Sequence, residues 1–264
     1  MYKIVILIIS MFLIGCGGSG DDSTQKTKII TSIKEASGIC YVSKTDTLFV
    51  VGDNGFVYEI DKNGSKLNEK DLSTRANNDF EGIAYDEQED LLYIALEGVD
   101  NILVLNRALE YQREVNVNRQ DSEGRDILEN KNEGLEGISI YKGKVYLSNQ
   151  SFKKLPKSDP SVLVKLDSVS GDKANIEEVI NHGYLNISGM TFYDDMLYLV
   201  SDSGNLLIKY DIVTGKVINA QRIKDFDDTL SGIALEGVAF DNEGYIYFAI
   251  DDENEGRVLK YKFF

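Results

Sequence analysis

The hydrophobic pattern repeats five times along the chain. In each unit a polar residue followed by glycine opens a short apolar run, a polar turn follows, and a second apolar run ends on an acidic or polar residue. The opening glycines lie roughly 45 to 55 residues apart, a period typical of arrays in which each unit is one small β-sheet. These glycines are Gly38, Gly82, Gly137, Gly189 and Gly237.

The apolar runs predict β-strands, because they are short, rich in Val, Ile, Tyr and Phe, and bounded by Gly, Asp or Asn. The second run of each unit is continuously apolar, which indicates burial on both faces. A third run follows in every unit, and a more polar fourth run follows in four of them. The four outer runs are 66–72, 111–117, 176–180 and 217–223.

The last unit has no fourth run before the chain ends at Phe264, whereas residues 27–34 precede the first unit and have no other partner. Pairing these two ends in one blade would close a ring and remove its exposed edge. We therefore predict an all-β, five-bladed β-propeller over residues 27–264. A sixth blade is the alternative, placed between Arg107 and Asn132, where the second half is polar and charged.

The N-terminal residues predict a lipoprotein signal rather than part of the fold. Lys3 precedes an apolar run that is too short for a comfortable membrane helix, and Leu13-Ile14-Gly15-Cys16 resembles a bacterial lipobox. We expect residues 1–15 to be a signal peptide, Cys16 to be lipid-modified and residues 16–26 to form a flexible tether. Gly17, where an aspartate would indicate retention in the inner membrane, favours the outer membrane of a bacterial cell envelope. The alternative is an ordinary signal peptide.

The formal net charge of −16 argues against nucleic acid or an anionic membrane surface as a partner and suits cations. Only Cys40 remains once Cys16 is acylated, so no disulfide is expected. We interpret Cys40 as a small buried hydrophobic residue.

Two sets of side chains are expected at one mouth of the channel, because the first two strands of a blade are antiparallel. The first set precedes the inner strands and comprises Ser37, Glu81, Glu136, Ser188 and Glu236. The second set ends the second strands and comprises Asp53, Glu97, Gln150, Asp202 and Asp251. The loops that lead to the next blade add Asp79, Glu133, Asp227 and Asp228. We call this end of the channel the acidic mouth.

Carboxylates so crowded raise each other's pKa unless a cation or hydrogen-bond donors neutralise them. Because neither set contains cysteine or histidine, the oxygen donors favour Ca²⁺ over Zn²⁺ or copper. The expected ligands are Glu81, Glu136 and Glu236, followed by Asp53 and Asp202. A possible ligand face adds Glu97, Gln150, Asp251 and His182. Alternatively, the glutamates accept backbone hydrogen bonds and only tie neighbouring blades together.

Three features of the sequence resemble the SdiA-regulated family of bacterial β-propellers. They are the acid-glycine openings at Glu81, Glu136 and Glu236, the acids that end the second strands, and the closing segment Lys209-Tyr210-Asp211. That family is distantly akin to NHL-repeat proteins. The resemblance covers about residues 27–264 and implies five blades, a calcium site and no established reaction. Ser37 and Ser188 stand where the pattern has glutamate, so a full ring of five carboxylates is not expected.

These features predict a membrane-anchored module that binds calcium and recognises an unknown protein or small molecule. The alternative is a metal-dependent hydrolase of an ester, lactone or phosphoester, with His182 as a candidate general base. The insertions 118–134 and 151–160 would wall a cleft or bind a partner. The recurrent tyrosines of the blades, such as Tyr93 and Tyr198, are interpreted as blade packing.

Overall fold

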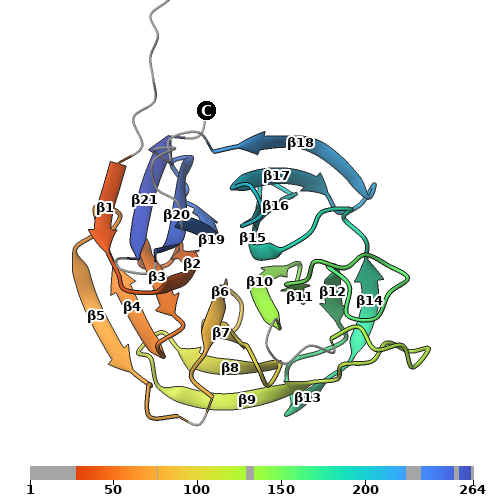
Figure 1. Ribbon diagram of the computed structural model, residues 1–264. Helices are drawn as coiled ribbons and strands as arrows, with labels where there is room; N and C mark the ends of the chain where they lie inside the picture. Colours follow the sequence, from red (N-terminus) through yellow and green to blue (C-terminus); the bar gives the residue numbers. More distant parts are fainter. Residues whose placement is uncertain (1–27, 76, 129–133, 224–232, 253–255, 263–264) are drawn as a thin grey trace, which may run out of the picture.

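The computed structural model describes residues 28–75, 77–128, 134–223, 233–252 and 256–262. The described elements are all strands, and they form five small sheets around a central channel (Figure 1). The predicted five-bladed propeller is therefore confirmed. The segment proposed for a sixth blade carries only the end of blade 2 and an isolated bridge between Gln120 and Asp126 among the described residues.

Each blade is a meander of four antiparallel strands that starts at the channel. The first blade contains β2 (Ala36–Val42), β3 (Thr47–Gly52), β4 (Phe56–Ile60) and β5 (Lys66–Asp71). The second contains β6 (Phe80–Asp86), β7 (Leu91–Leu96), β8 (Asn101–Asn106) and β9 (Tyr111–Val117). The third contains β10 (Leu135–Tyr141), β11 (Lys144–Asn149), β12 (Leu163–Leu166) and β14 (Ile176–Ile180). The fourth contains β15 (Ile187–Tyr193), β16 (Met196–Ser201), β17 (Leu206–Asp211) and β18 (Lys216–Arg222).

The fifth blade joins the two ends of the fold. It contains β19 (Ile233–Phe240), β20 (Tyr245–Asp252) and β21 (Arg257–Lys262), and its outer strand is β1 (Lys28–Ser32). β1 pairs antiparallel with β21, with Lys28 opposite Lys260 and Ser32 opposite Arg257. Figure 1 shows the two strands side by side at the rim of the ring. This pairing confirms the predicted closure.

A short strand, β13 (Lys173–Ala174), is the one addition to the predicted plan. It lies in the connection between β12 and β14 but pairs in parallel with β9 of the preceding blade. The Arg113 guanidinium in β9 also donates to the carbonyl oxygen of Val169 at 3.0 Å. The connection between β12 and β14 of blade 3 therefore packs against the outer edge of blade 2.

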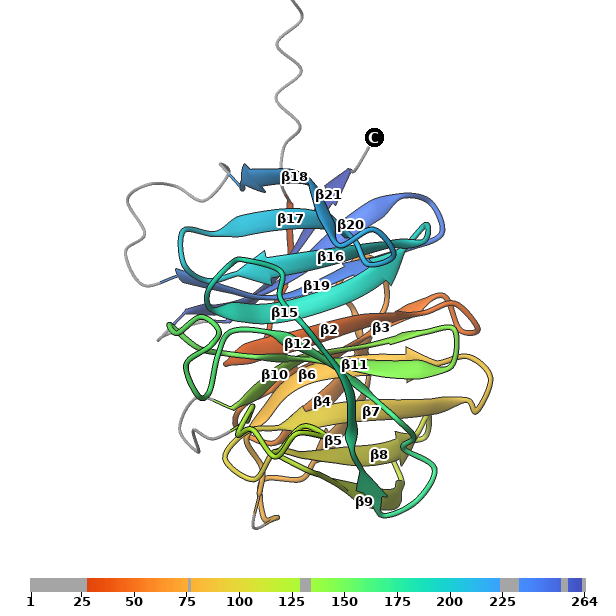
Figure 2. The ribbon, with the colours of Figure 1, turned by 90° about the vertical axis from the view of Figure 1, so that its right-hand side faces the viewer.

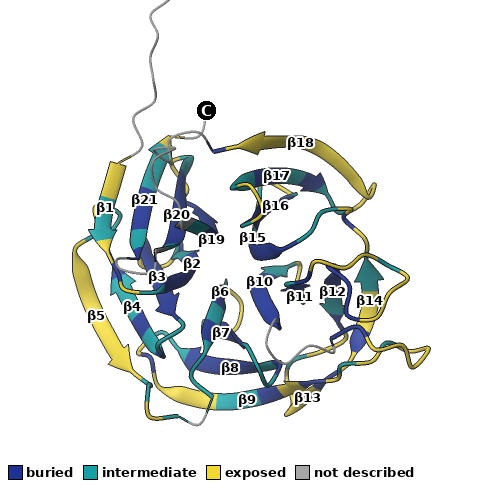
Figure 3. Cartoon of the chain, in the orientation of Figure 1, coloured by how far each residue is buried: buried dark blue, intermediate teal, exposed yellow. Residues whose placement is uncertain are grey.

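The hydrophobic core lies between the blades. Five buried clusters each combine side chains from two neighbouring blades, and the second strands are buried along nearly their whole length. The outer strands β5 and β18 are exposed (Figure 3). Tyr93, Tyr198 and Tyr247 are fully buried, in agreement with their predicted packing role. Cys40 is a buried free thiol, also as predicted.

Glycines let the inner strands approach one another closely around the channel, which runs along the strands (Figure 2). A Cβ atom at Gly189 would lie 2.1 Å from the carbonyl oxygen of Glu236 in the next blade, and one at Gly82 would lie 2.2 Å from that of Glu136. The space enclosed by the glycine ring has a volume of about 10 Å³, enough for about one water molecule. The two mouths of the channel are thus distinct sites.

The predicted signal peptide, Cys16 and the whole of the tether lie outside the described residues. Among the residues that are described, no helix is long and apolar enough to cross a membrane.

Candidate metal centre at the acidic mouth

Strand register brings the two predicted sets together at one mouth. In the second blade Phe80 pairs with Leu96, so the following glutamates, Glu81 and Glu97, lie at the same end of the sheet. In the fourth blade Ile187 pairs with Ser201 in the same way. The equivalent pairing recurs in all five blades.

Every inner strand carries a β-bulge at the residue of the first set. The register shifts between Phe80 and Ile83 in blade 2, between Leu135 and Ile138 in blade 3, and at the corresponding positions of the other blades. A bulge interrupts the alternation of side chains and turns one of them in a new direction. The bulges thus present Glu81, Glu136 and Glu236 together instead of leaving them in the pleat of the strand.

The three glutamates of the first set form an electrostatically coupled group. Glu136 is only 3% exposed, and burial together with the charge of Glu81 raises its pKa well above the ordinary value. The pKa of Glu81 is raised in the same direction by burial and by Glu236. Burial and Asp202 raise the pKa of Glu236 to about 8. The predicted crowding of these carboxyls is thus present.

A close group of carboxylate oxygens lies on blade 2. One carboxylate oxygen each from Asp79, Glu81 and Glu97 can be chosen so that all three atoms lie within 4.8 Å of one another. Burial and Asp79 raise the pKa of Glu97 to about 7. Glu97 Oε1 also accepts a hydrogen bond from the backbone N–H of Gly134 at 3.2 Å, which ties blade 3 to this group.

A residue two positions before the first set contacts the acid that ends the second strand. In blade 1 this residue is Glu35, and burial together with Glu35 raises the pKa of Asp53 to about 7. Lys34 Nζ lies 2.9 Å from Glu35 Oε1 and lowers the pKa of Glu35, so the proton of this pair resides on Asp53. In blade 4 the Asn186 amide donates to Asp202 Oδ2 at 2.8 Å.

Glu35 was missed by the sequence reasoning, although a signal for it exists. It stands two residues before Ser37, as Asp79 stands two residues before Glu81. Aligning the blades on their glycines would therefore have found it.

Among the described residues, no lysine or arginine forms an ion pair with Glu81, Glu97, Glu136 or Glu236. Ion pairs at this mouth instead join Lys34 to Glu35 at 2.9 Å and Arg119 to the buried Asp100 at 2.7 Å. The group must therefore hold protons or bind a cation.

A serine adds a further hydrogen bond between blades at this mouth. Ser188 Oγ donates to the carbonyl oxygen of Leu235 in the next blade at 2.6 Å. Ser37 Oγ instead donates to Glu35 within its own blade. Ser188 also hydrogen-bonds to Glu236, which partly offsets the rise in the pKa of Glu236 that burial causes. A glutamate of the first set therefore takes part in the contact between blades 4 and 5.

The remaining predicted positions fall around this group. Gln150 and Asp251 are half-buried at the ends of their strands, whereas Glu133, Asp227 and Asp228 lie outside the described residues. His182 is buried, and its pKa is lowered to about 4 by burial and by Lys154. Its Nδ1 accepts a hydrogen bond from Tyr184 N at 3.2 Å, so Nε2 carries the proton. This arrangement does not favour a general base.

The raised pKa values predict a pH-dependent stability of the metal-free protein. An ordinary carboxyl has a pKa of about 4 in an unfolded chain. Asp53 and Glu97 titrate near 7 and Glu236 near 8 in the folded protein. Between these values the folded state binds more protons, so stability falls as pH rises. We expect the melting temperature without metal to be higher at about pH 5.5 than at about pH 8 by about 5 °C.

Thermal unfolding followed by circular dichroism, in chelator between about pH 5.5 and pH 8, tests that prediction. In saturating Ca²⁺ the melting temperature should depend much less on pH. A melting temperature that rises between about pH 5.5 and pH 8 would contradict the crowding of these carboxyls.

The fold and the acidic mouth define a five-bladed propeller with a candidate cation site at one mouth of its channel. A family model described as SdiA-regulated matches residues 22–253, and the chain belongs to that family. A comparison with curated proteins finds no match.

Two solved structures show the same fold at low sequence identity. Glutaminyl cyclase from Myxococcus xanthus is 13% identical, with a TM-score of 0.60, 89% of this chain covered and 96% of that chain covered. A protein described as glucose dehydrogenase is 10% identical, with a TM-score of 0.58, 89% of this chain covered and 98% of that chain covered. At such identity the likeness shows the fold alone.

Proposed function

We propose that this protein is a lipid-anchored envelope protein whose propeller binds Ca²⁺ at the acidic mouth and presents that mouth to a binding partner. The observation that carries the proposal is the convergence of Asp79, Glu81 and Glu97, whose oxygens lie within 4.8 Å of one another. Glu236 adds negative charge beside them, since it helps to raise the pKa of Glu81. Glu136 lies within reach of the same charges, since burial, Glu81 and Glu97 raise its own pKa.

The chemistry of the donors suits calcium. All candidate ligands are oxygens, and Ca²⁺ accepts six to eight of them in irregular geometry, whereas Mg²⁺ demands a near-ideal octahedron. Asp79, Glu81 and Glu97 would hold the ion, with Glu136 and Glu236 completing its electrostatic surroundings. The sequence ranked Glu97 below Asp53 and Asp202. We instead place Glu97 among the ligands, because it belongs to the close group whereas Asp53 and Asp202 do not.

Binding requires carboxylates, so the ion must displace the protons that the crowded group holds. We therefore expect Ca²⁺ affinity to fall by about tenfold when the pH is lowered from about 7.5 to about 6.5, through the groups that titrate near 7. Titrations at the two pH values in buffers of different ionisation enthalpy measure both the affinity and the protons released. An affinity independent of pH would place the ion elsewhere.

A melting experiment tests the proposed calcium site. The segment 22–264 contains every described strand and is the material of choice. We expect Ca²⁺ at a hundredfold excess over its Kd to raise the melting temperature by about 5 to 10 °C over the chelated protein. Mg²⁺ at the same concentration should give a much smaller rise. Equal melting temperatures in Ca²⁺ and chelator would overturn the proposal.

The enzymatic alternative is distinguished by turnover. A hydrolase of esters, lactones or phosphoesters would cleave a member of a substrate panel only when the ion is bound. A recognition module would bind Ca²⁺ without turnover. The panel therefore separates the two roles once binding is measured.

The membrane anchor rests on the lipobox ending at Cys16. We propose that the cysteine carries the lipid and that the outer membrane receives the protein. Labelling cells with a palmitate analogue should mark the wild type and leave a Cys16→Ser variant unlabelled and released from the membrane fraction. Label retained by the variant would contradict the anchor, and density fractionation separates the two membranes.

A further inference from the structure

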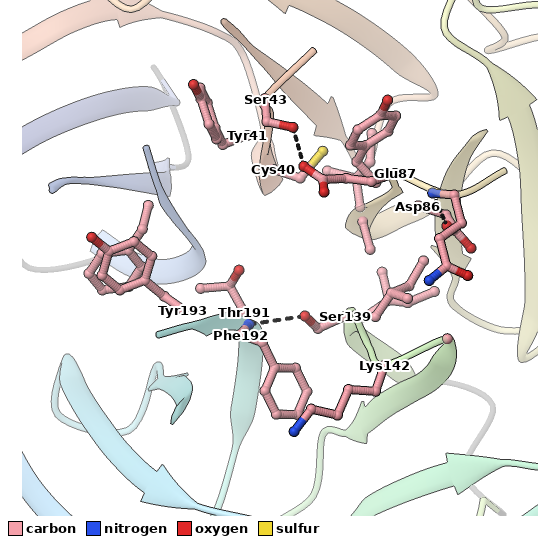
Figure 4. A pocket seen from close by; sticks show the side chains of 18 of the residues that line it. Cys40, Tyr41, Ser43, Asp86, Glu87, Ser139, Lys142, Thr191, Phe192 and Tyr193 are labelled. Carbon is pink, nitrogen blue, oxygen red and sulfur yellow. Dashed lines mark hydrogen bonds between the residues drawn. The ribbon is translucent and has the colours of Figure 1, made fainter. Parts of the chain in front are cut away.

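A cavity lies at the mouth opposite the acidic one. Its volume is about 510 Å³, within the usual range of small-molecule sites, roughly 300 to 1,000 Å³. It is formed where the inner strands end and turn into the second strands of their blades (Figure 4). The narrow glycine ring separates it from the carboxylates discussed above. We call this cavity the aromatic funnel.

Aromatic side chains from four of the five blades line the funnel: Tyr41, Tyr85, Phe192, Tyr193 and Phe240. The rings of Tyr41, Phe192 and Tyr193 stand around the opening in Figure 4. Tyr193 stacks on Phe240 with centroids 4.5 Å apart, which holds the wall between blades 4 and 5 in place. The wall is therefore preformed.

The tyrosine hydroxyls are engaged away from a ligand. Tyr41 donates to Asp46 Oδ1 at 2.7 Å, and Tyr85 donates to Asp90 Oδ1 at 2.8 Å. Burial and these carboxylates raise the pKa of both tyrosines to about 12, so both stay neutral phenols. Hydrogen bonding to a carboxylate makes a phenol ring more electron-rich, which strengthens its attraction for a cation.

The charges at the funnel are unbalanced. Three carboxylates, Asp86, Glu87 and Asp194, line it together with one ammonium group, Lys142. That ammonium already lies 4.5 Å from the centroid of the Tyr141 ring and 3.5 Å from Asp195. Lys142 thus shows that an ammonium group is accommodated at the rim, over the ring of Tyr141 and beside the carboxylate of Asp195. An excess of negative charge remains for a second cation and disfavours an anion.

We propose that the aromatic funnel binds a small organic cation, such as an amine or a quaternary ammonium compound. The aromatic wall would receive the apolar groups around the nitrogen, and Asp86 and Glu87 would balance its charge. This site is independent of calcium binding, because it uses other residues at the other mouth.

Choline is the probe, with glucose as a neutral probe and acetate as an anionic one. Each is titrated by ligand-observed NMR into the segment 22–264 in saturating Ca²⁺, so that the acidic mouth is occupied by metal. Choline should bind saturably, and neither glucose nor acetate should bind. Absence of choline binding, or binding of glucose alone, would overturn the proposal.

Two variants test whether choline binds in the funnel. Glu87→Gln combined with Asp86→Asn should weaken choline binding by about tenfold or more, and Tyr193→Leu by about tenfold. Glu89→Gln is the matched control, because this exposed residue lies on the same turn without lining the funnel. Equal loss in the control and the double variant would show a diffuse charge effect and overturn the site. Because Tyr193→Leu disturbs packing, the melting temperature of this variant is checked. If Tyr193→Leu is unfolded, the result with the Glu87→Gln, Asp86→Asn variant alone decides whether choline binds in the funnel.

Discussion

Replacement of Gly189 by alanine is expected to lower the melting temperature of the propeller by more than about 10 °C, or to prevent folding. The added Cβ atom would lie 2.1 Å from the carbonyl oxygen of Glu236 and 3.0 Å from the Cα atom of Gly237. Both neighbours are backbone atoms of the next blade, so neither can move without widening the ring. Overpacking a core costs about 1 to 3 kcal/mol even where side chains can adjust.

Gly171→Ala is the matched control for this prediction. Nothing lies within 4 Å of the position where its Cβ atom would be, and Gly171 is exposed. We expect its melting temperature to stay within about 2 °C of the wild type. If Gly189→Ala melts like Gly171→Ala, the inner strands are not packed as closely as described here.

The Glu81→Gln, Glu136→Gln double variant is expected to weaken Ca²⁺ binding by at least about a hundredfold. It removes one carboxylate that would hold the ion and one that adds charge beside it, and each lost charge is worth about tenfold or more. The same variant should melt several degrees above the wild type in chelator near pH 8. Glutamine keeps the shape of glutamate and removes the repulsion that raises the pKa of both groups.

Weaker Ca²⁺ binding together with a higher melting temperature in chelator would distinguish a metal site from glutamates that only hold neighbouring blades together. If the glutamates only held blades together as hydrogen-bond acceptors, the double variant would melt below the wild type, because an anionic acceptor would be lost. Glu69→Gln on the exposed strand β5 is the control and should change neither property measurably. Melting curves recorded in chelator and in Ca²⁺ measure both the stability without metal and the stabilisation by Ca²⁺ for each variant.

The fold could be predicted from the sequence because its signals are local. The apolar runs, the turn residues and the repeat of the glycines define each blade without reference to its neighbours. The ring closure followed from one unpaired segment at each end, and β1 and β21 confirm it. β13 was missed because a strand of two residues leaves no pattern.

The site was predicted less completely, since it depends on relations between blades. The sequence placed Glu81, Glu136 and Glu236 at one mouth. It gave no sign of the bulges that turn them, because a bulge is a shift in pairing and not in composition. The approach of Asp79, Glu81 and Glu97 depends on how the bulge and the strand ends of blade 2 orient their side chains, so Asp79 and Glu97 rose in importance only in the structure.

The aromatic funnel shows the same limit. The recurrent tyrosines were interpreted as packing residues from their place in the repeat. Tyr85 is one of them, and its hydroxyl donates a hydrogen bond to Asp90 within its own blade. That its ring also lines a cavity follows from the meeting of several blades, which no single repeat records.

The measurement that tests the central claim most directly is a calorimetric titration of Ca²⁺ into metal-stripped segment 22–264 near pH 8. We expect one saturable site per chain, release of protons to the buffer, and loss of the heat signal in the Glu81→Gln, Glu136→Gln variant. No saturable heat in the wild type, or an unchanged signal in the variant, would contradict a calcium site at the acidic mouth.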